Sequence, residues 1–166
     1  MDKEIIELFE KLIDPRISAT REHYIELEKL EKKLLVELES EPHDLEIRGC
    51  LANIYITLDK LDESIKMFDS MIEIDNTNLD GYEGAGRIRL LKADDIFKQA
   101  SISADLENYY ILTQKAENLY MEAVPFLEKY YSKEPSSKYK TLLKNVYFKL
   151  RNVNSEFLKK FNQLNS

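Results

Sequence analysis

The amino-acid sequence predicts an all-α protein, and three observations support that fold class. Gly and Pro are scarce among the 166 residues, at four each, so few residues can interrupt long elements. Glu, Lys and Leu, which are strong helix formers, dominate many stretches. Apolar residues recur at spacings of three and four, the period of an amphipathic helix. Hydrophobic residues make up 43% and charged residues 33%, which is typical of one folded domain, here 1–166.

Three similar breaks divide the chain. They are Glu41-Pro42-His43-Asp44, Asp75-Asn76-Thr77-Asn78 and Glu134-Pro135-Ser136-Ser137. Each break places an acid, then a helix breaker, then a residue able to cap the next helix. The first two breaks lie 34 residues apart and the second and third lie 59 apart, which is 34 plus 25. We therefore predict a helical repeat with a period of 34 and an insertion of about 25 residues in one unit.

The segment 45–78 carries the clearest repeat. Its first half holds Leu51-Ala52 and Tyr55, and its second half holds Leu61, Ser64 and Phe68. A small residue such as Ser64 suits the close crossing of two helices, and Asp62 is the expected cap of the second helix. This order of residues resembles the tetratricopeptide repeat (TPR) family, although Arg48 and Asn76 replace its usual aromatic and proline. The resemblance implies a short α-solenoid of antiparallel helical hairpins.

The next unit, 79–137, is elongated. Tyr82, Ala85 and Gly86 restart the first-helix pattern, but the second-helix pattern returns only at Ala123 and Leu127. The inserted residues include no Gly or Pro, and apolar spacing from Leu106 onward predicts a helix that begins near 106. We expect a hairpin that turns near 101–105, whose two helices each gain about 18 Å and project past their neighbours.

Hairpins of looser pattern complete the chain at both ends. Residues 1–40 form a degenerate N-terminal hairpin, and 138–166 form a C-terminal capping hairpin in which Asn154 caps the second helix. The whole prediction is about eight helices in four hairpins, one of them elongated. The segment Ala123-Val124-Pro125-Phe126 is similar to second helices of bacterial TPR proteins, which favours a bacterial source.

Known catalytic and metal-binding patterns are missing from the sequence. The two histidines, His23 and His43, form neither a Glu-x-x-His pair nor a His-Glu-x-x-His motif. The single cysteine, Cys50, has no basic residue at i±3 or i±4 that would lower its pKa. We predict no enzyme activity, no cofactor and no metal site. An enzyme with an unrecognised site is the alternative.

Net charge is −7, but it is unevenly distributed. Residues 129–166 carry nine Lys and Arg against two Asp and Glu, whereas 1–128 carry 15 against 29. The acidic total argues against nucleic acid, and no apolar run is long enough to span a membrane. One explanation is that two solvated faces simply differ in charge. The other is that the basic tail docks an acidic partner or the acidic body of a second copy. A single cysteine and a charged N-terminal segment indicate a cytoplasmic protein.

The TPR resemblance implies that the first helices of successive hairpins line a concave groove that holds a peptide or helix of a partner. When the groove positions of that family are carried over one by one, the residues expected to face the groove are Asn53 and Ile56 on one helix and Glu83, Arg87 and Leu90 on the next first helix. We therefore predict an adaptor or scaffold for protein–protein interaction. The alternatives are a chaperone of secreted proteins and a self-assembling structural protein, with a homodimer possible. Seven tyrosines between 109 and 147 are expected mainly in the core, with some exposed as interface anchors.

Overall fold

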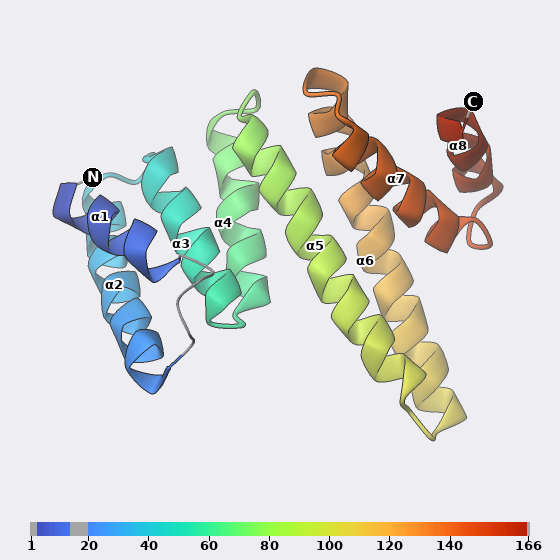
Figure 1. The fold of residues 1–166 in the computed structure, drawn as a ribbon, viewed down its shortest axis with the longest axis horizontal. Helices are drawn as coiled ribbons and strands as arrows, with labels where there is room; N and C mark the ends of the chain where they lie inside the picture. Colours follow the sequence, from blue (N-terminus) through green and yellow to red (C-terminus); the bar gives the residue numbers. More distant parts are fainter. Residues whose placement is uncertain (1–2, 14–19, 166) are drawn as a thin grey trace. The chain divides into compact units, whose positions relative to one another are not determined.

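The computed structural model describes residues 3–13 and 20–165, and within them it contains eight α-helices and no strand (Figure 1). The all-α prediction is confirmed, and the succession of helices packed on their chain neighbours fits a helical repeat. Residues 14–19 of the expected N-terminal hairpin lie outside the described part. The helices are α1 (Lys3–Leu12), α2 (Arg21–Ser40), α3 (Leu45–Thr57), α4 (Leu61–Ile74), α5 (Leu79–Ser101), α6 (Leu106–Lys133), α7 (Ser137–Leu150) and α8 (Ser155–Asn165).

The chain divides into two compact units, Met1–Gly81 and Tyr82–Ser166. Unit 1 contains α1 to α4, and unit 2 contains nearly all of α5 together with α6, α7 and α8. The division falls in the first turn of α5, inside what the sequence suggested was one domain. Each unit is therefore described by itself.

The three predicted breaks cap the helices that follow them. A side-chain oxygen of Asp44 accepts a hydrogen bond from the backbone N–H of Ile47 at 2.9 Å, and Asn78 accepts one from Gly81 at 2.6 Å. Ser136 accepts one from Tyr139 at 3.3 Å. Such bonds satisfy backbone donors that have no partner inside the helix. Helix boundaries at these three breaks thus follow directly from the sequence.

The turn between α3 and α4 differs from the expectation. Asp62 was expected to cap α4, but α4 begins at Leu61 and Lys60 is its cap residue, without a side-chain hydrogen bond. The N–H of Lys60 reaches back to the carbonyl of Tyr55 at 2.8 Å, and that of Asp59 to Ile56 at 3.1 Å. This pair of bonds is a Schellman ending, which closes α3 within two residues and leaves Asp62 inside the first turn of α4. Asp59 takes the left-handed conformation, with φ 58°.

Unit 1 buries its apolar residues between successive helices. Helix α2 packs on α1 and on α3, and α3 packs on α4. Leu27, Leu30 and Leu34 of α2 are fully buried against Leu51 and Ile54 of α3. Ser64 of α4 is fully buried, and its hydroxyl donates to the carbonyl of Ala52 at 3.0 Å. The prediction of a small residue at the α3–α4 crossing is therefore confirmed.

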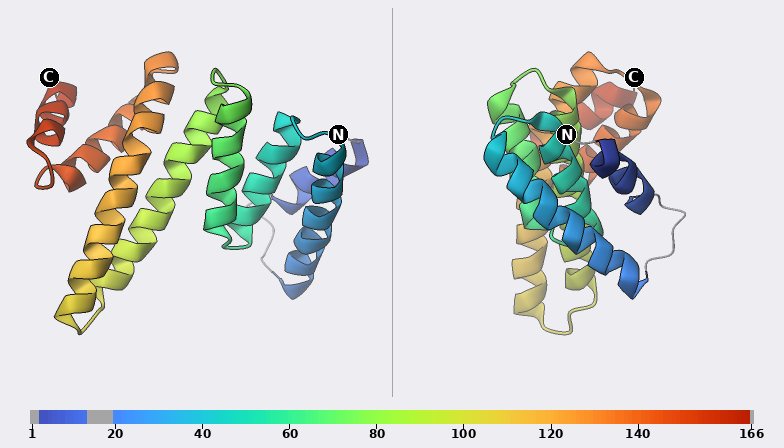
Figure 2. Two further views of the ribbon diagram at one scale, coloured as in Figure 1. Left: turned by 180° about the vertical axis from the view of Figure 1, so that it is seen from behind. Right: turned by 90° about the vertical axis from the view of Figure 1, so that its left-hand side faces the viewer.

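Unit 2 is built on the predicted long hairpin. Helices α5 and α6 have 23 and 28 residues, against 14 and 11 for α7 and α8. The turn lies where the spacing predicted it, between Ser101 and Leu106, and α6 continues through Pro125. The two helices approach closely at Gly86, where a Cβ atom would meet the Leu127 side chain at 2.7 Å. The free end of the hairpin extends past α7 and α8 in both figures (Figure 1, Figure 2).

Candidate functional site

The predicted groove residues of α3 lie on the surface of unit 1. Asn53 is exposed, and its side-chain amide donates to the carbonyl of Gly49 at 2.8 Å, one turn earlier on the same helix. Ile56 is partly exposed. The amide of Asn53 retains its side-chain oxygen as an acceptor, so the residue can still contact a polar group of a partner.

The predicted groove residues of α5 have three different environments in unit 2. Arg87 is mostly exposed and pairs with Glu83 at 3.2 Å, and Glu83 also accepts the hydroxyl hydrogen of Tyr139 from α7. Leu90 is only 7% exposed and lies in the core of unit 2. Its side chain therefore packs inside the unit and is not part of a surface. The α3 and α5 residues belong to different units, so the structure does not join them into one site.

Most of the clustered tyrosines serve the core of unit 2. Three of them form what we call tyrosine triads, in which a buried tyrosine donates its hydroxyl hydrogen to a carboxylate that also pairs with a cation. The triads are Tyr120–Asp94–Lys149, Tyr139–Glu83–Arg87 and Tyr147–Glu128–Lys160. In the last, Glu128 lies 2.6 Å from the tyrosine oxygen and 2.8 Å from the lysine nitrogen. Burial, reinforced by the carboxylate contact, raises the pKa of all three tyrosines.

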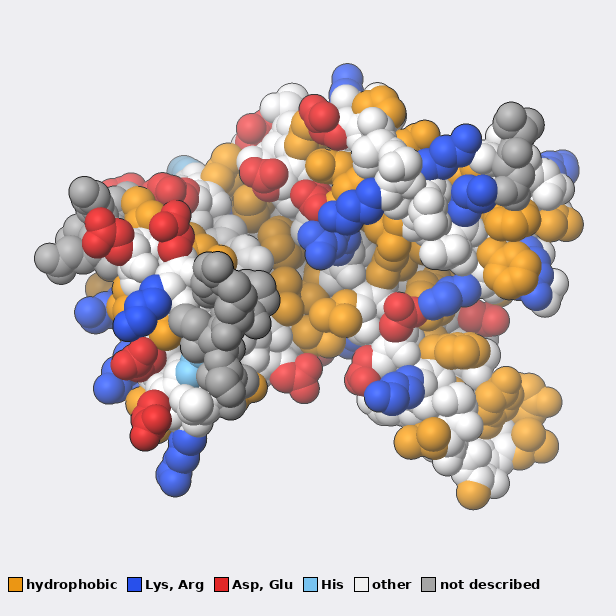
Figure 3. Space-filling model, viewed as in Figure 1, with side chains coloured by type: hydrophobic (Ala, Val, Ile, Leu, Met, Phe, Trp, Pro, Cys, Tyr) orange, Lys and Arg blue, Asp and Glu red, His pale blue; other side chains and the backbone are white. Residues whose placement is uncertain are grey.

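The far end of the α5–α6 hairpin exposes its large apolar side chains, unlike the buried core of unit 2. Large apolar side chains are exposed there on both helices and the turn, and Figure 3 shows them gathered at the lower right. We name this surface the hairpin end; it consists of Phe97, Ile102, Leu106, Tyr109, Tyr110 and Ile111. Ile102 is 79% exposed, Leu106 66% and Tyr110 63%. Six large apolar side chains exposed at one end of a hairpin are more than the scattered single exposures of an ordinary surface, and such a group indicates an interaction site.

The hairpin end is exposed because α7 is too short to cover it. Leu90 is buried in the core of unit 2, but Phe97, two turns further along the same side of α5, is 44% exposed. Tyr120 is buried beside Lys149 of α7, but Tyr109, three turns earlier on the same side of α6, is 36% exposed. The apolar face that α7 covers thus continues beyond its last residue without a neighbour among the described helices of unit 2.

The charges around the hairpin end are mainly negative. Residues 95–111 hold Asp95, Asp105 and Glu107 against Lys98. Asp105 caps α6, and its carboxylate accepts the N–H groups of Glu107 and Asn108, each at 3.2 Å. The surface therefore combines exposed apolar groups with a net charge of −2 at neutral pH.

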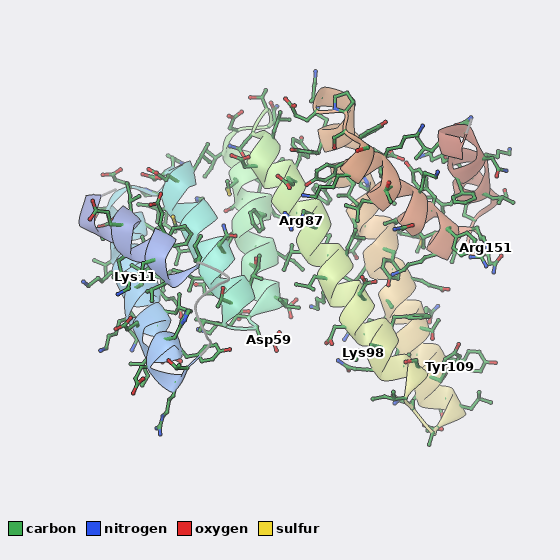
Figure 4. The ribbon with its side chains drawn as sticks, in the orientation of Figure 1. Lys11, Asp59, Arg87, Lys98, Tyr109 and Arg151 are labelled. Atoms are coloured by element: carbon green, nitrogen blue, oxygen red, sulfur yellow. The ribbon has the colours of Figure 1, made fainter. Side chains whose placement is uncertain are left out.

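A second exposed apolar surface lies where α7 turns into α8. We name it the basic turn; its apolar members are Phe148, Val153 and Leu158, which are 48%, 39% and 43% exposed. The Arg151 guanidinium stacks over the Phe148 ring at 3.7 Å, and Lys159 is exposed nearby in sequence. Residues 148–160 carry four Lys and Arg against Glu156 alone. In Figure 4 the labelled Arg151 and Tyr109 lie well apart on unit 2.

The described residues contain no group of three or more His, Cys, Asp and Glu side chains able to hold a metal ion. Cys50 is buried in α3, and burial with the charges of Glu46 and Asp44 raises the pKa of its thiol to about 12. The thiol is thus protonated and shielded at neutral pH, which is unfavourable for a nucleophile. None of the helices over 3–13 and 20–165 has the length and hydropathy needed to cross a bilayer.

Sequence reasoning foresaw the long hairpin but did not identify its end as a surface. A signal was present for Tyr110 and Ile111, because they lie off the stripe of residues that packs α6 on α5. Apolar residues outside the packed stripe of a helix indicate exposure.

No protein-family model matches the chain, and neither does any curated protein.

Proposed function

We propose that this protein binds another protein, as an adaptor or scaffold of helical-repeat type, and that the hairpin end is its contact surface. The observation that supports the proposal is the exposure of six large apolar side chains at one end of unit 2. Tyrosine supplies large contact area at low entropic cost, and Tyr109 and Tyr110 pack edge to face at 5.5 Å within this surface. A rigid helical hairpin presents such groups without ordering a loop.

The TPR resemblance of 45–78 is part of the same proposal, since repeat proteins of that family are binding scaffolds. Their concave groove is a second candidate surface, with Asn53 and Ile56 on α3 and Glu83 and Arg87 on α5 as its contacts. The groove proposal rests on the sequence, whereas the hairpin-end proposal rests on exposed apolar groups. A cytoplasmic location is also proposed, because the single cysteine suits a reducing compartment.

The proposal predicts that a partner recovered from lysate of the native host depends on the hairpin end. Tagged wild-type protein is compared with Ile102→Glu/Tyr110→Glu and with the groove variant Asn53→Ala/Arg87→Glu by quantitative mass spectrometry. Val36→Glu on α2 is the matched control, because Val36 and Tyr110 are both 63% exposed. We expect the hairpin-end variant to lose the partner at least about tenfold, as removal of interface anchors does, while the control retains it.

Each outcome of that comparison has a definite meaning, provided that circular dichroism shows every variant to be folded. A partner lost by the groove variant and kept by the hairpin-end variant moves the site to the concave face. A chain that recovers no protein, not even untagged copies of itself, contradicts the interaction function altogether.

A further inference from the structure

The hairpin end and the basic turn have complementary properties. Both expose large apolar side chains, but their charges differ in sign. Residues 95–111 carry a net charge of −2. Residues 148–160 carry four cations against Glu156, and two of these cations, Arg151 and Lys159, are not used in ion pairs with Asp94 or Glu128 as Lys149 and Lys160 are. Apolar contact provides affinity, while opposite charge favours the correct partner and orientation. The negatively charged, apolar hairpin end thus complements the positively charged, apolar basic turn of the same unit.

Two of the four cations at the basic turn are available for an outside partner. Among the described residues, Arg151 and Lys159 have no ion pair with a carboxylate, whereas Lys160 pairs with Glu128 at 2.8 Å. At the hairpin end, Glu107 likewise has no ion pair with a cation in the described part of the chain. Charges that have no ion pair in the described part of the chain are available to pair across an interface.

The two surfaces of a single copy do not meet. The free end of the hairpin and the turn between α7 and α8 lie apart in Figure 1 and in the left view of Figure 2. Contact between them therefore requires two molecules. An acidic surface is less suited to a second acidic hairpin end, because like charges across an interface oppose association.

We infer that the partner of the hairpin end is a second copy of this chain, whose basic turn receives it. This inference rests on the proposed function and names the occupant of its contact surface. The contact is heterologous, since different surfaces of the two copies meet, so each bound copy keeps one surface of each kind free. Association then continues beyond the dimer, into a closed ring or an open filament, and the protein acts as a self-assembling scaffold.

The test uses two variants of the full chain, each of which changes the charge of one surface. The end variant is Ile102→Lys/Tyr110→Lys and the turn variant is Arg151→Glu/Lys159→Glu. Val36→Lys is the control, and circular dichroism verifies that all three are folded. Sedimentation velocity measures the mass of each protein, and of an equimolar mixture of the two variants, over a wide range of concentration at low and high salt.

The inference predicts that wild type and control grow past the dimer with concentration and that high salt weakens the association. Each variant alone self-associates at least about tenfold more weakly than wild type and therefore stays monomeric over the concentrations measured. Their mixture forms a 1:1 dimer that does not grow, because only one intact pair of surfaces remains.

Two results overturn the inference. A wild-type chain that is monomeric at every concentration excludes a second copy, and if the hairpin-end variant still loses a lysate partner, the proposed function stands alone. Wild-type dimers that the mixture of variants does not restore indicate contact between like surfaces. If wild type is monomeric and no partner is recovered, both proposals fail together.

Discussion

At the scale of single residues, two glycines within helices have opposite roles. Gly86 of α5 lies against Leu127 of α6, where a Cβ would meet side-chain carbons at 2.7 Å and the backbone nitrogen at 3.3 Å. Gly49 of α3 has room for a Cβ, which would make an ordinary van der Waals contact with the Met71 methyl at 3.8 Å. The sequence shows that both lie in helices, but the helix contact that requires a glycine is visible only in the packed hairpin.

The alanine substitutions of these glycines should therefore change stability in opposite directions. Gly86→Ala is expected to lower the free energy of unfolding by about 1–3 kcal/mol, because an overpacked contact outweighs the gain in helix propensity. Gly49→Ala is expected to raise it by about 0.5–1 kcal/mol. Urea unfolding followed by circular dichroism measures both. Equal effects of the two substitutions would contradict the close approach of α5 and α6.

At the scale of elements, the sequence predicts starts of helices better than their ends. Asp44, Asn78 and Ser136 are recognisable caps, and the structure uses all three. The end of α3 is harder to predict, because its left-handed residue is Asp59 rather than the usual glycine. The hairpin turn was predictable because spacing of apolar residues resumes at Leu106. The exposure of Phe97, Leu106 and Tyr109 was not predictable, since it depends on where α7 stops.

The tyrosine triads connect the helices of unit 2 and can be tested one by one. Tyr147→Phe is expected to lower the free energy of unfolding by about 1 kcal/mol, because it removes the hydroxyl bond to Glu128 but leaves Lys160 on that carboxylate. Tyr110→Phe is the control, since Tyr110 is exposed at the hairpin end and no hydroxyl hydrogen bond is found for it in the described residues. Denaturant unfolding distinguishes the two, and equal losses would argue against the triad.

At the scale of the whole molecule, the repeat period predicts which helices pair but not how the chain divides. The predicted groove requires one continuous solenoid, whereas Asn53 lies in unit 1 and Arg87 in unit 2. Their joint role stays a prediction. Charge asymmetry between 1–128 and 129–166 was visible in the sequence, whereas the pairing of Lys149 and Lys160 inside unit 2 was not. That pairing leaves Arg151 and Lys159 as the cations of the basic turn that have no ion pair among the described residues.

The two units also carry separate groups that titrate at high pH. In unit 1 the pKa of Cys50 is raised to about 12, and in unit 2 burial raises the pKa of Tyr120, Tyr139 and Tyr147. A raised pKa means that the folded state holds the proton more tightly than the unfolded state. The resulting stability is complete below the unfolded pKa and is lost as pH rises through the folded pKa.

Stability should therefore fall in two stages, first above the unfolded thiol pKa of about 8.5–9 and more steeply above about 10, where unfolded tyrosines ionise. Cys50 alone accounts for a loss of about 2–3 kcal/mol by pH 10.5. We expect Cys50→Ala to remove the first stage and Tyr120→Phe/Tyr139→Phe/Tyr147→Phe to flatten the second, although the triple variant is less stable at neutral pH. Denaturant unfolding at successive pH values measures both slopes. An unchanged first stage in Cys50→Ala would contradict the buried thiol, and an unchanged second stage in the triple variant would contradict the triads.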